Sequence, residues 1–327
     1  MKNILLITTG GTISMKLDRQ KGGAVPSLKG DDLVRALPPI QNLTNLDVYE
    51  FANIPSPYMT PALMLELAHF IDEKCKSLYD GVVVTHGTDT LEETAFFLET
   101  VLHTTKPVVI TAAMRNTDEL SGDGPRNIWA ALNTAVCKSY TDDIGVTIVL
   151  NDEIHTARDV TKTYTSNVAT FRSPLFGPVG LVDNDKVTFF FKPYNRVKIY
   201  TPRVENRVAL LKAYAGMEGD IIESIVGLGY KGIVIEAFGR GNLPNWIVEP
   251  IKKAIDANIA VVISSRCYMG RVLGDYAYDG GGKKLEEVGT MFAYDLRGIK
   301  ARILLMLALG KYDSDISKCR QIFSFLE

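Results

Sequence analysis

Four short apolar runs place the strongest constraint on how this chain can fold. Each run is rich in Val or Ile and is bounded by Gly, Pro or Asp, a pattern typical of strands buried on both faces of a parallel sheet. The runs are Ile4–Thr8, Gly81–Thr85, Pro107–Thr111 and Val146–Leu150. We therefore expect the first half of the chain to form a parallel sheet that is covered on both sides.

Helical patterns separate these runs. The expected helices are Ala62–Lys76, Leu91–Val101 and Asn127–Val136. The second opens with Glu92 and Glu93, and acidic residues favour the first turn of a helix. Strands that alternate with helices in this way predict an α/β fold.

The alternation of predicted strands and helices is interrupted between Asn184 and Asn206 and then resumes. With 327 residues, the chain is longer than one compact core usually allows. We predict two α/β domains: a larger N-terminal parallel-sheet domain at residues 1–188, an interdomain connection at 189–207, and a smaller C-terminal α/β domain at 208–327. The later strands are expected at Val208–Ala213, Gly232–Ala237 and Ile259–Ile263, and the later helices at Asn245–Ala257 and Gly298–Leu309, with Asp295 as a helix cap.

Charge and cysteine content exclude several classes of protein. The chain has 36 basic and 38 acidic residues, so it offers no broad positive field and we expect no nucleic-acid partner. No apolar stretch is long enough to span a membrane. The four cysteines are widely spaced without a C-x-x-C pair, and the N-terminal apolar run is too short for a signal peptide. We expect a cytoplasmic protein without a membrane partner.

Two glycine-containing turns are candidates for chemistry. Thr8–Ile13 and Thr85–Thr90 each follow a predicted strand directly, at the edge of a parallel sheet where ligands bind. Glycine lets the backbone approach a ligand closely, and free N–H groups in such turns can hold an anion. Each turn could instead be purely structural or bind a nucleotide phosphate. The nucleotide interpretation is disfavoured because neither G-x-G-x-x-G nor G-x-x-x-x-G-K-[ST] follows the first strand.

A third candidate is Lys162, within Arg158–Thr163. The sequence leaves two interpretations open: a solvated surface lysine, or a buried amine beside a hydroxyl that serves as a base. The four histidines show no metal-ligand spacing, so we expect no metal, and no G-x-S-x-G motif indicates a serine hydrolase.

These segments together resemble the bacterial-type L-asparaginase family, in family order over nearly the whole chain. The lack of a signal peptide makes the chain similar to the cytoplasmic type I branch. The matching segments are Thr9–Ile13, Thr85–Thr90, Ala112–Arg115, Ser121–Pro125, Asp159–Thr163, Ala237–Asn242 and Ser264–Arg266.

The resemblance implies a threonine-nucleophile mechanism that needs no cofactor. Thr12 would attack the side-chain amide of L-asparagine and form an acyl intermediate, which water would hydrolyse to aspartate after ammonia leaves. Thr88, Asp89 and Lys162 would activate either Thr12 or the water. Backbone N–H groups of the two turns would stabilise the oxyanion.

The resemblance also implies how the substrate is held. Asp89 would pair with the α-ammonium group, and Ser56 would meet the α-carboxylate. Thr88 would also contact the substrate, and the carbonyl of Ala113 would orient the amide nitrogen. Ser56 lies between two prolines, so a plain turn residue is the alternative interpretation.

The chain departs from the family pattern in two places. The lid after the first turn usually carries a tyrosine that contacts the nucleophile, and Ile13 to Leu28 contains none. Many members place a glutamate where this chain has Ala277. Tyr276 is our candidate for the missing tyrosine, with Tyr278 second, and an interface aromatic residue is the alternative.

Three functions remain under consideration. The first is an L-asparagine amidohydrolase with weak glutaminase activity, assembled as a homodimer or homotetramer as the family implies. The second is the ammonia-releasing subunit of a transamidation complex, which a first strand so near the N-terminus disfavours. The third is an amino-acid sensor with inactive chemistry, which would not need Lys162.

Overall fold

The computed structural model describes residues 1–193 and 196–327. Contacts divide the chain into two compact units, Met1–Arg196 and Val197–Glu327, and each unit has its own sheet. In the expected connection at 189–207, Phe189 ends the last strand of the first unit, and residues 194 and 195 lie outside the described part of the chain.

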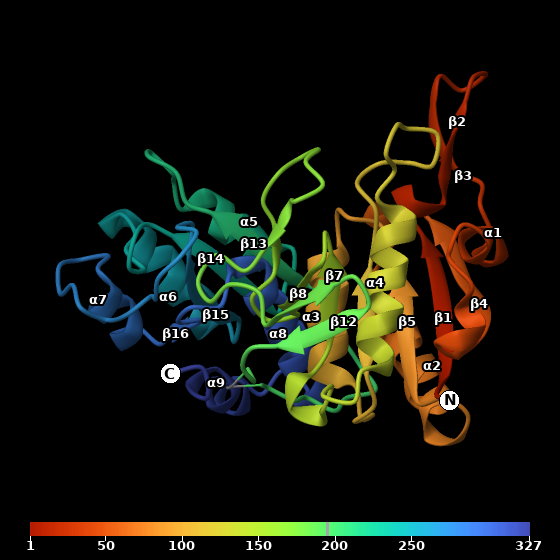
Figure 1. Cartoon of the computed structure of the whole chain (residues 1–327). Coiled ribbons are helices and arrows are strands. Elements are labelled where there is room, and N and C mark those ends of the chain that lie inside the picture. The colour runs from red at the N-terminus through yellow and green to blue at the C-terminus, as the bar shows by residue number, and fades with distance from the viewer. Residues whose placement is uncertain (194–195) are drawn as a thin grey trace. The chain divides into compact units, whose positions relative to one another are not determined.

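An eight-stranded sheet forms the centre of the first unit, among the residues that the structure describes (Figure 1). Its strand order is β12-β11-β8-β7-β6-β5-β1-β4. The strands are β1 (Asn3–Gly10), β4 (Asn45–Ile54), β5 (Gly81–Thr85), β6 (Val108–Thr111), β7 (Thr147–Leu150), β8 (Glu153–Thr156), β11 (Gly180–Asp183) and β12 (Lys186–Phe189).

The sheet is mostly parallel, as the buried apolar runs predicted. β4, β1, β5, β6 and β7 pair in parallel, and β5, β6 and β7 are fully buried. The antiparallel strands β8, β11 and β12 were not predicted. Exposed residues alternate with less exposed ones along β11 and β12, so these strands lack the continuous apolar signal of a strand covered on both faces.

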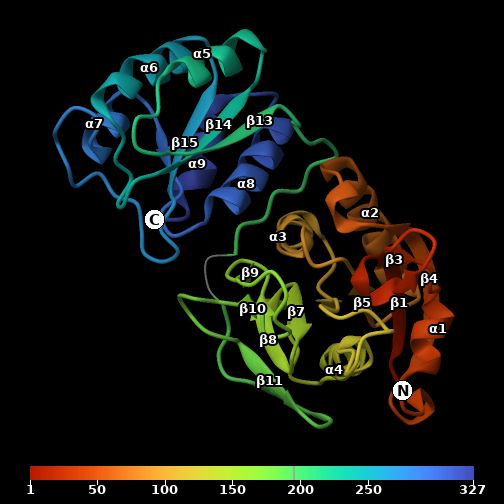
Figure 2. The same ribbon diagram turned by 90° about the horizontal axis from the view of Figure 1, so that it is seen from above.

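Helices cover both faces of the parallel strands. Figure 2 shows α4 (Gly124–Val136) on the opposite side of the sheet from α2 (Pro61–Ser77) and α3 (Leu91–Val101). The Thr60 hydroxyl caps α2 by accepting from the amide of Leu63, and proline occupies the first turn of α2 and α4. A shorter helix, α1 (Gly30–Arg35), packs against β4 and β1.

The order of the parallel strands places a topological switch point between β1 and β5. The chain leaves β1 toward β4 on one side, and then crosses to β5 on the other side and continues to β6 and β7. Open α/β sheets bind ligands beyond the carboxyl ends of the strands at such a point. Both glycine-containing turns follow these two strands, so the fold directs them to the same place.

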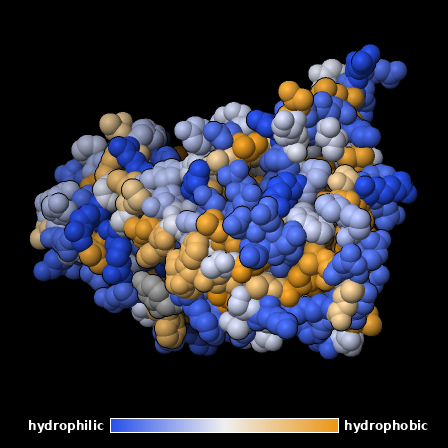
Figure 3. Space-filling model, viewed as in Figure 1, coloured by the Kyte–Doolittle hydropathy of each residue, from blue (hydrophilic) through white to orange (hydrophobic). Residues whose placement is uncertain are grey.

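A hairpin follows the first turn. It consists of β2 (Met15–Asp18) and β3 (Gly23–Pro26), which pair antiparallel after the short 3-10 helix η1 (Thr12–Ser14). Figure 1 shows it projecting beyond the sheet, and its tip is hydrophilic in Figure 3. The carboxylate of Asp118 accepts a hydrogen bond of 2.7 Å from the amide of Leu17, which ties the hairpin to the loop before α4.

The second unit is a smaller parallel α/β unit. Its sheet has the order β13-β14-β15-β16, with every neighbouring pair parallel. The elements are β13 (Val208–Lys212), α5 (Asp220–Gly227), β14 (Gly232–Ala237), α6 (Val248–Asp256), β15 (Ala260–Ser265), α7 (Gly282–Glu287), β16 (Met291–Phe292), α8 (Gly298–Lys311) and α9 (Ile316–Ser324). The prediction that Asp295 caps α8 is wrong. The helix begins at Gly298, so the capping position falls on Arg297, two residues later.

No helix in the described ranges is both long and apolar enough to cross a membrane.

Candidate active site

Three loops at the carboxyl ends of β1, β4 and β5 are joined by hydrogen bonds. The amide of Gly11 donates to the carbonyl of Ile54 over 3.1 Å. The hydroxyl of Thr9 donates to the carbonyl of Thr85 over 3.0 Å. These bonds hold the predicted nucleophile turn against the other two loops.

Ser56 lies in the loop after β4 and is almost fully buried. Its hydroxyl oxygen accepts from the amide of Asp89 over 3.1 Å, and its carbonyl accepts from the hydroxyl of Thr90 over 2.7 Å. A Cβ on Gly87 would lie 2.6 Å from that of Ser56, so a larger residue at position 87 would displace the serine. The loop after β5 thus fits closely around Ser56.

Thr12 begins η1 and is half-buried. Its hydroxyl has no hydrogen-bond partner among residues 1–193 and 196–327. A Cβ on Gly124 would lie 3.1 Å from the side chain of the next residue, Ile13, and 3.6 Å from the Cβ of Ala113. Ala113, fully buried after β6, therefore lies close to the turn that carries Thr12.

Lys162 forms the central polar contact of the site. Its Nζ donates to the hydroxyl of Thr88 over 2.9 Å and to Oδ1 of Asp89 over 2.7 Å. The side chain of Lys162 is 17% exposed and that of Asp89 is 60% exposed. The amine of Lys162 thus lies beside a hydroxyl in a mostly buried setting, and Asp89 keeps a face open to solvent.

The sequence indicates Glu92 only as a residue that favours the start of a helix. It lies in the first turn of α3, and the residue is 8% exposed. Its Oε1 accepts from the hydroxyl of Thr161 over 3.1 Å and from the amide of Lys162 over 3.3 Å. No pattern in the sequence predicts these contacts, because a glutamate in the first turn of a helix also occurs where the helix surface is exposed.

His86 supports the loop after β5. Its Nδ1 lies 2.8 Å from the carbonyl of Gly87, and its Nε2 lies 3.0 Å from the hydroxyl of Thr94. A carbonyl only accepts, so Nδ1 carries the proton and Thr94 donates to Nε2. Complete burial lowers the pKa of His86 to about 4, which keeps the ring neutral at physiological pH.

The second unit contains Tyr276, the candidate for the missing lid tyrosine. It lies in the loop between β15 and α7, and its side chain is 47% exposed. Its ring centroid is 6.0 Å from that of Tyr278, and both rings face solvent. The other predicted site residues, Thr12, Ser56, Thr88, Asp89, Ala113 and Lys162, are all in the first unit.

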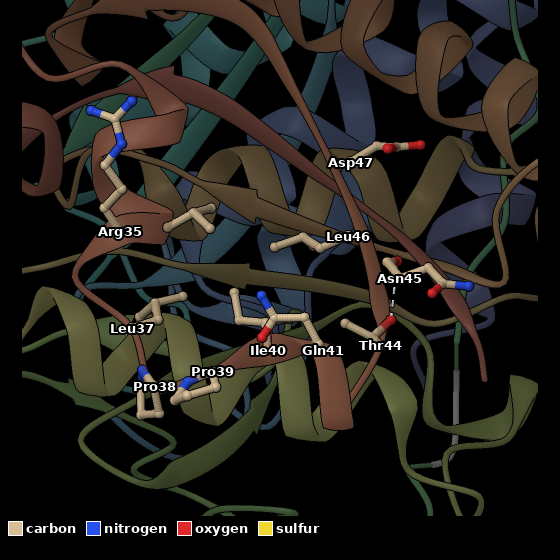
Figure 4. Close-up of a pocket in the computed structure, with 11 residues that line it drawn as sticks. Arg35, Leu37, Pro38, Pro39, Ile40, Gln41, Thr44, Asn45, Leu46 and Asp47 are labelled. Carbon is tan, nitrogen blue, oxygen red and sulfur yellow. Dashed lines mark hydrogen bonds between the residues drawn. The ribbon is translucent and has the colours of Figure 1, made fainter.

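A cavity of about 640 Å³ occupies a different part of the first unit. It is lined by residues between 34 and 47, and Figure 4 shows Arg35 on one side and Thr44 and Asn45 on the other. These residues precede or begin β4, whereas Ser56 follows the end of that strand. The length of β4 separates its two ends by about 30 Å. The cavity is therefore not part of the site formed by the three loops.

In the described part of the chain, no group of three or more His, Cys, Asp or Glu side chains is arranged to hold a metal ion.

Comparisons with known proteins agree with this architecture. The family model described as "Asparaginase, N-terminal" matches residues 3–195, and "Glutaminase/Asparaginase C-terminal domain" matches residues 207–323. The chain belongs to the asparaginase family. Its relatives include proteins named as asparaginases and proteins named as part of a glutamyl-tRNA(Gln) amidotransferase.

Three relatives span nearly all of the chain. A protein from Deinococcus radiodurans named "Probable L-asparaginase" is 39% identical over 99% of this chain and 98% of its own length. A component of the glutamyl-tRNA(Gln) amidotransferase from Pyrococcus furiosus is 33% identical over 98% of this chain and 75% of its own length. A crystal structure of "Probable Cytoplasmic L-asparaginase" from Campylobacter jejuni is 33% identical, covers 99% of both chains and has a TM-score of 0.88.

Proposed function

We propose that this chain is an L-asparagine amidohydrolase that releases L-aspartate and ammonia through an acyl intermediate on Thr12. One observation carries the proposal: in a member of the asparaginase family, the amine of Lys162 is bonded to Thr88 and Asp89 beside two interlocked glycine turns. A binding protein would not require a buried amine at a threonine hydroxyl.

In the proposed reaction, the hydroxyl oxygen of Thr12 attacks the carbon of the side-chain amide and loses its proton. The tetrahedral intermediate collapses, the carbon–nitrogen bond breaks, and the nitrogen leaves as ammonia after it takes up a proton. Water then attacks the resulting ester and releases aspartate with Thr12 restored. Backbone N–H groups of the two turns stabilise the negative oxygen in both steps, and one such donor is typically worth about 10²–10³ in rate.

An aliphatic hydroxyl is a weak nucleophile at neutral pH and needs a base. We assign this role to the Thr88–Lys162 pair, acting on Thr12 or on the attacking water. The contact of 2.9 Å between Lys162 Nζ and the Thr88 hydroxyl supports the assignment, since it links an amine directly to a hydroxyl in a mostly buried setting.

The charges at the site fit a free amino acid. The exposed face of Asp89 suits an α-ammonium group. Ser56 accepts from the amide of Asp89, which leaves its own hydroxyl hydrogen free to donate to an α-carboxylate. With both ends held, the carbonyl of Ala113 would orient the amide nitrogen over Thr12.

We extend the proposal to three finer points. Tyr276 supplies the hydroxyl that the lid lacks, with Tyr278 as the second candidate. The active form is a homodimer or homotetramer. The protein is cytoplasmic, which is supported by four unpaired cysteines and by similarity to a structure described as cytoplasmic.

The ammonia-releasing component of an amidotransferase is a second candidate, because the P. furiosus amidotransferase protein matches nearly the whole chain. In such a complex, ammonia release would depend on a partner protein. The free enzyme would need none.

The test is ammonia release from L-asparagine and, separately, from L-glutamine by the purified chain without a cofactor. We expect turnover of asparagine well above that of glutamine, with aspartate formed in equal amount. Binding of asparagine without ammonia release would overturn the proposal and favour a sensor or a partner-dependent component.

A further inference from the structure

The segment Thr88–Glu92 contacts Lys162 at two separate points. Thr88 and Asp89 bind its Nζ, and Glu92 binds its backbone amide. The flexible side chain of the lysine is thus fixed at both ends by a single loop and the first turn of the helix that follows it. The two points together determine where the amine lies relative to the Thr88 hydroxyl.

The strand that carries Lys162 is short. β9 (Thr161–Lys162) contains two residues and pairs with β10 (Phe171–Arg172), which is equally short. Two-stranded pairs of this length are not stable by themselves. The bonds from Thr161 and Lys162 to Glu92 Oε1 connect β9 to α3, one of the helices that cover the main sheet.

Stability alone does not account for a carboxylate at this position. Glu92 is 8% exposed, and its Oε2 is buried with no hydrogen-bond partner among the described residues. Burying a charged group without full pairing is unfavourable, and well-packed apolar residues usually stabilise such a position at least as well. The two donors at Oε1 are the contacts that an apolar residue could not replace.

We propose that Glu92 is a positioning residue that acts on the reaction by holding Lys162 at the hydroxyl of Thr88. This inference rests on the proposed role of Lys162 as part of the base. Glu92 is bonded to the hydroxyl of Thr161 and the backbone amide of Lys162, so its effect passes through the backbone of Lys162. A displacement of about 1 Å at a reacting group can cost about 10² in rate.

The test compares three variants in the ammonia assay. Glu92→Met removes the acceptor and retains the size of the side chain. We expect kcat for asparagine to fall about 10- to 100-fold and KM to change less than threefold, because Ser56 and the glycine turns remain in place. Glu92→Gln keeps an acceptor oxygen and should retain kcat within about threefold.

Glu99→Met is the matched control. Glu99 is a second buried glutamate on α3, and it accepts from the amide of Val146 and from Arg196, away from Lys162. Its replacement should lower thermal stability and leave kcat within about threefold. A merely structural role for Glu92 would give the same result for both Met variants, and that outcome would overturn the inference.

A second route covers the case in which Glu92→Met does not fold. Thr161→Val removes one donor to Oε1 with little change in shape, and it should lower kcat at least threefold with KM unchanged. A kcat equal to that of wild type in Thr161→Val would contradict the positioning role of Glu92.

Wild type and Lys162→Met are assayed alongside. If wild type releases no ammonia, the proposed function fails. If wild type is active and Lys162→Met is not, but Glu92→Met matches wild type, the positioning role alone fails.

Discussion

A Cβ atom on Gly11 would lie 2.2 Å from the Cα of Gly87. The two turns that follow β1 and β5 therefore touch through their backbones. Gly11 also has a φ of +81°, a region that residues with a Cβ rarely adopt. Glycine at position 11 is therefore required both by the backbone conformation and by the contact with Gly87.

Gly11→Ala should abolish turnover and lower stability by about 2 kcal/mol or more, because both the backbone conformation and the approach to Gly87 are lost. Thermal unfolding and the ammonia assay measure the two effects. Gly227→Ala is the control, since Gly227 ends α5 with open space around it, and it should be neutral or slightly stabilising. Full activity in Gly11→Ala would show that the two turns need not touch.

Thr12→Ala should lower kcat by at least about 10³ with the fold intact, because no nucleophile would remain. Circular dichroism and thermal unfolding check the fold, since the Thr12 hydroxyl makes no bond to another described residue. Mass spectrometry of a quenched reaction should detect an acyl adduct on wild type and none on the variant. Substantial residual turnover would remove Thr12 as the nucleophile.

Tyr276→Phe should reduce turnover strongly if its hydroxyl acts on Thr12. Tyr278→Phe is the matched comparison, because both rings lie in the same loop with similar exposure. A reduction of less than threefold in Tyr276→Phe, about 0.7 kcal/mol in barrier height, would favour the interpretation of Tyr276 as an interface aromatic residue instead. A larger loss in Tyr278→Phe would transfer the role to that residue.

Stability should depend on pH through His86. Its pKa is about 4 in the folded chain and 6.5 when exposed, so between these values the unfolded chain binds a proton that the folded chain does not. The contribution of neutral His86 to the free energy of unfolding is therefore fully present above pH 6.5, and this free energy falls by about 3 kcal/mol as the pH falls to 4. Denaturant unfolding of wild type and His86→Gln across this range measures the difference, and an equal pH dependence would contradict it.

Four parallel strands of the first sheet, β1, β5, β6 and β7, could be predicted because they are continuous apolar runs, whereas the parallel strand β4 was not predicted. Ile4–Thr8 and Gly81–Thr85 are continuous runs of this kind, and both are strands in the structure. The family resemblance also located the two turns, and the strand order explains why they meet. β4, β11 and β12 could not be predicted in the same way, since exposed residues interrupt the apolar run. β8 is mostly buried, but its residues Glu153, His155 and Thr156 are polar.

Contacts between segments that are far apart in the sequence could not be predicted from local patterns, for a different reason. The family resemblance grouped Lys162 with Thr88 and Asp89, and the structure brings the three together. The residues around Lys162 do not by themselves distinguish a surface lysine from one bonded to Thr88, because the distinction depends on where β9 lies in three dimensions. The contacts of Glu92 with Thr161 and Lys162 were not predicted for the same reason, because its place at the start of a helix already accounted for a glutamate there. Asp295 illustrates a different error. Aspartate favours the capping position of a helix, so Asp295 was predicted to cap α8, but Arg297 occupies that position.

The bond between Lys162 and Thr88 joins residues that are 74 positions apart, and it spans the parallel and antiparallel parts of the first unit. Contacts between segments so distant in sequence form late in folding, because closing a long loop is entropically costly. The bond between Thr9 and Thr85 joins residues 76 positions apart, so the loops after β1 and β5 also meet through contacts that are distant in sequence. During refolding, binding of asparagine and ammonia release should therefore return in the same kinetic phase, and earlier recovery of binding in stopped-flow and quenched assays would show that the two parts fold separately.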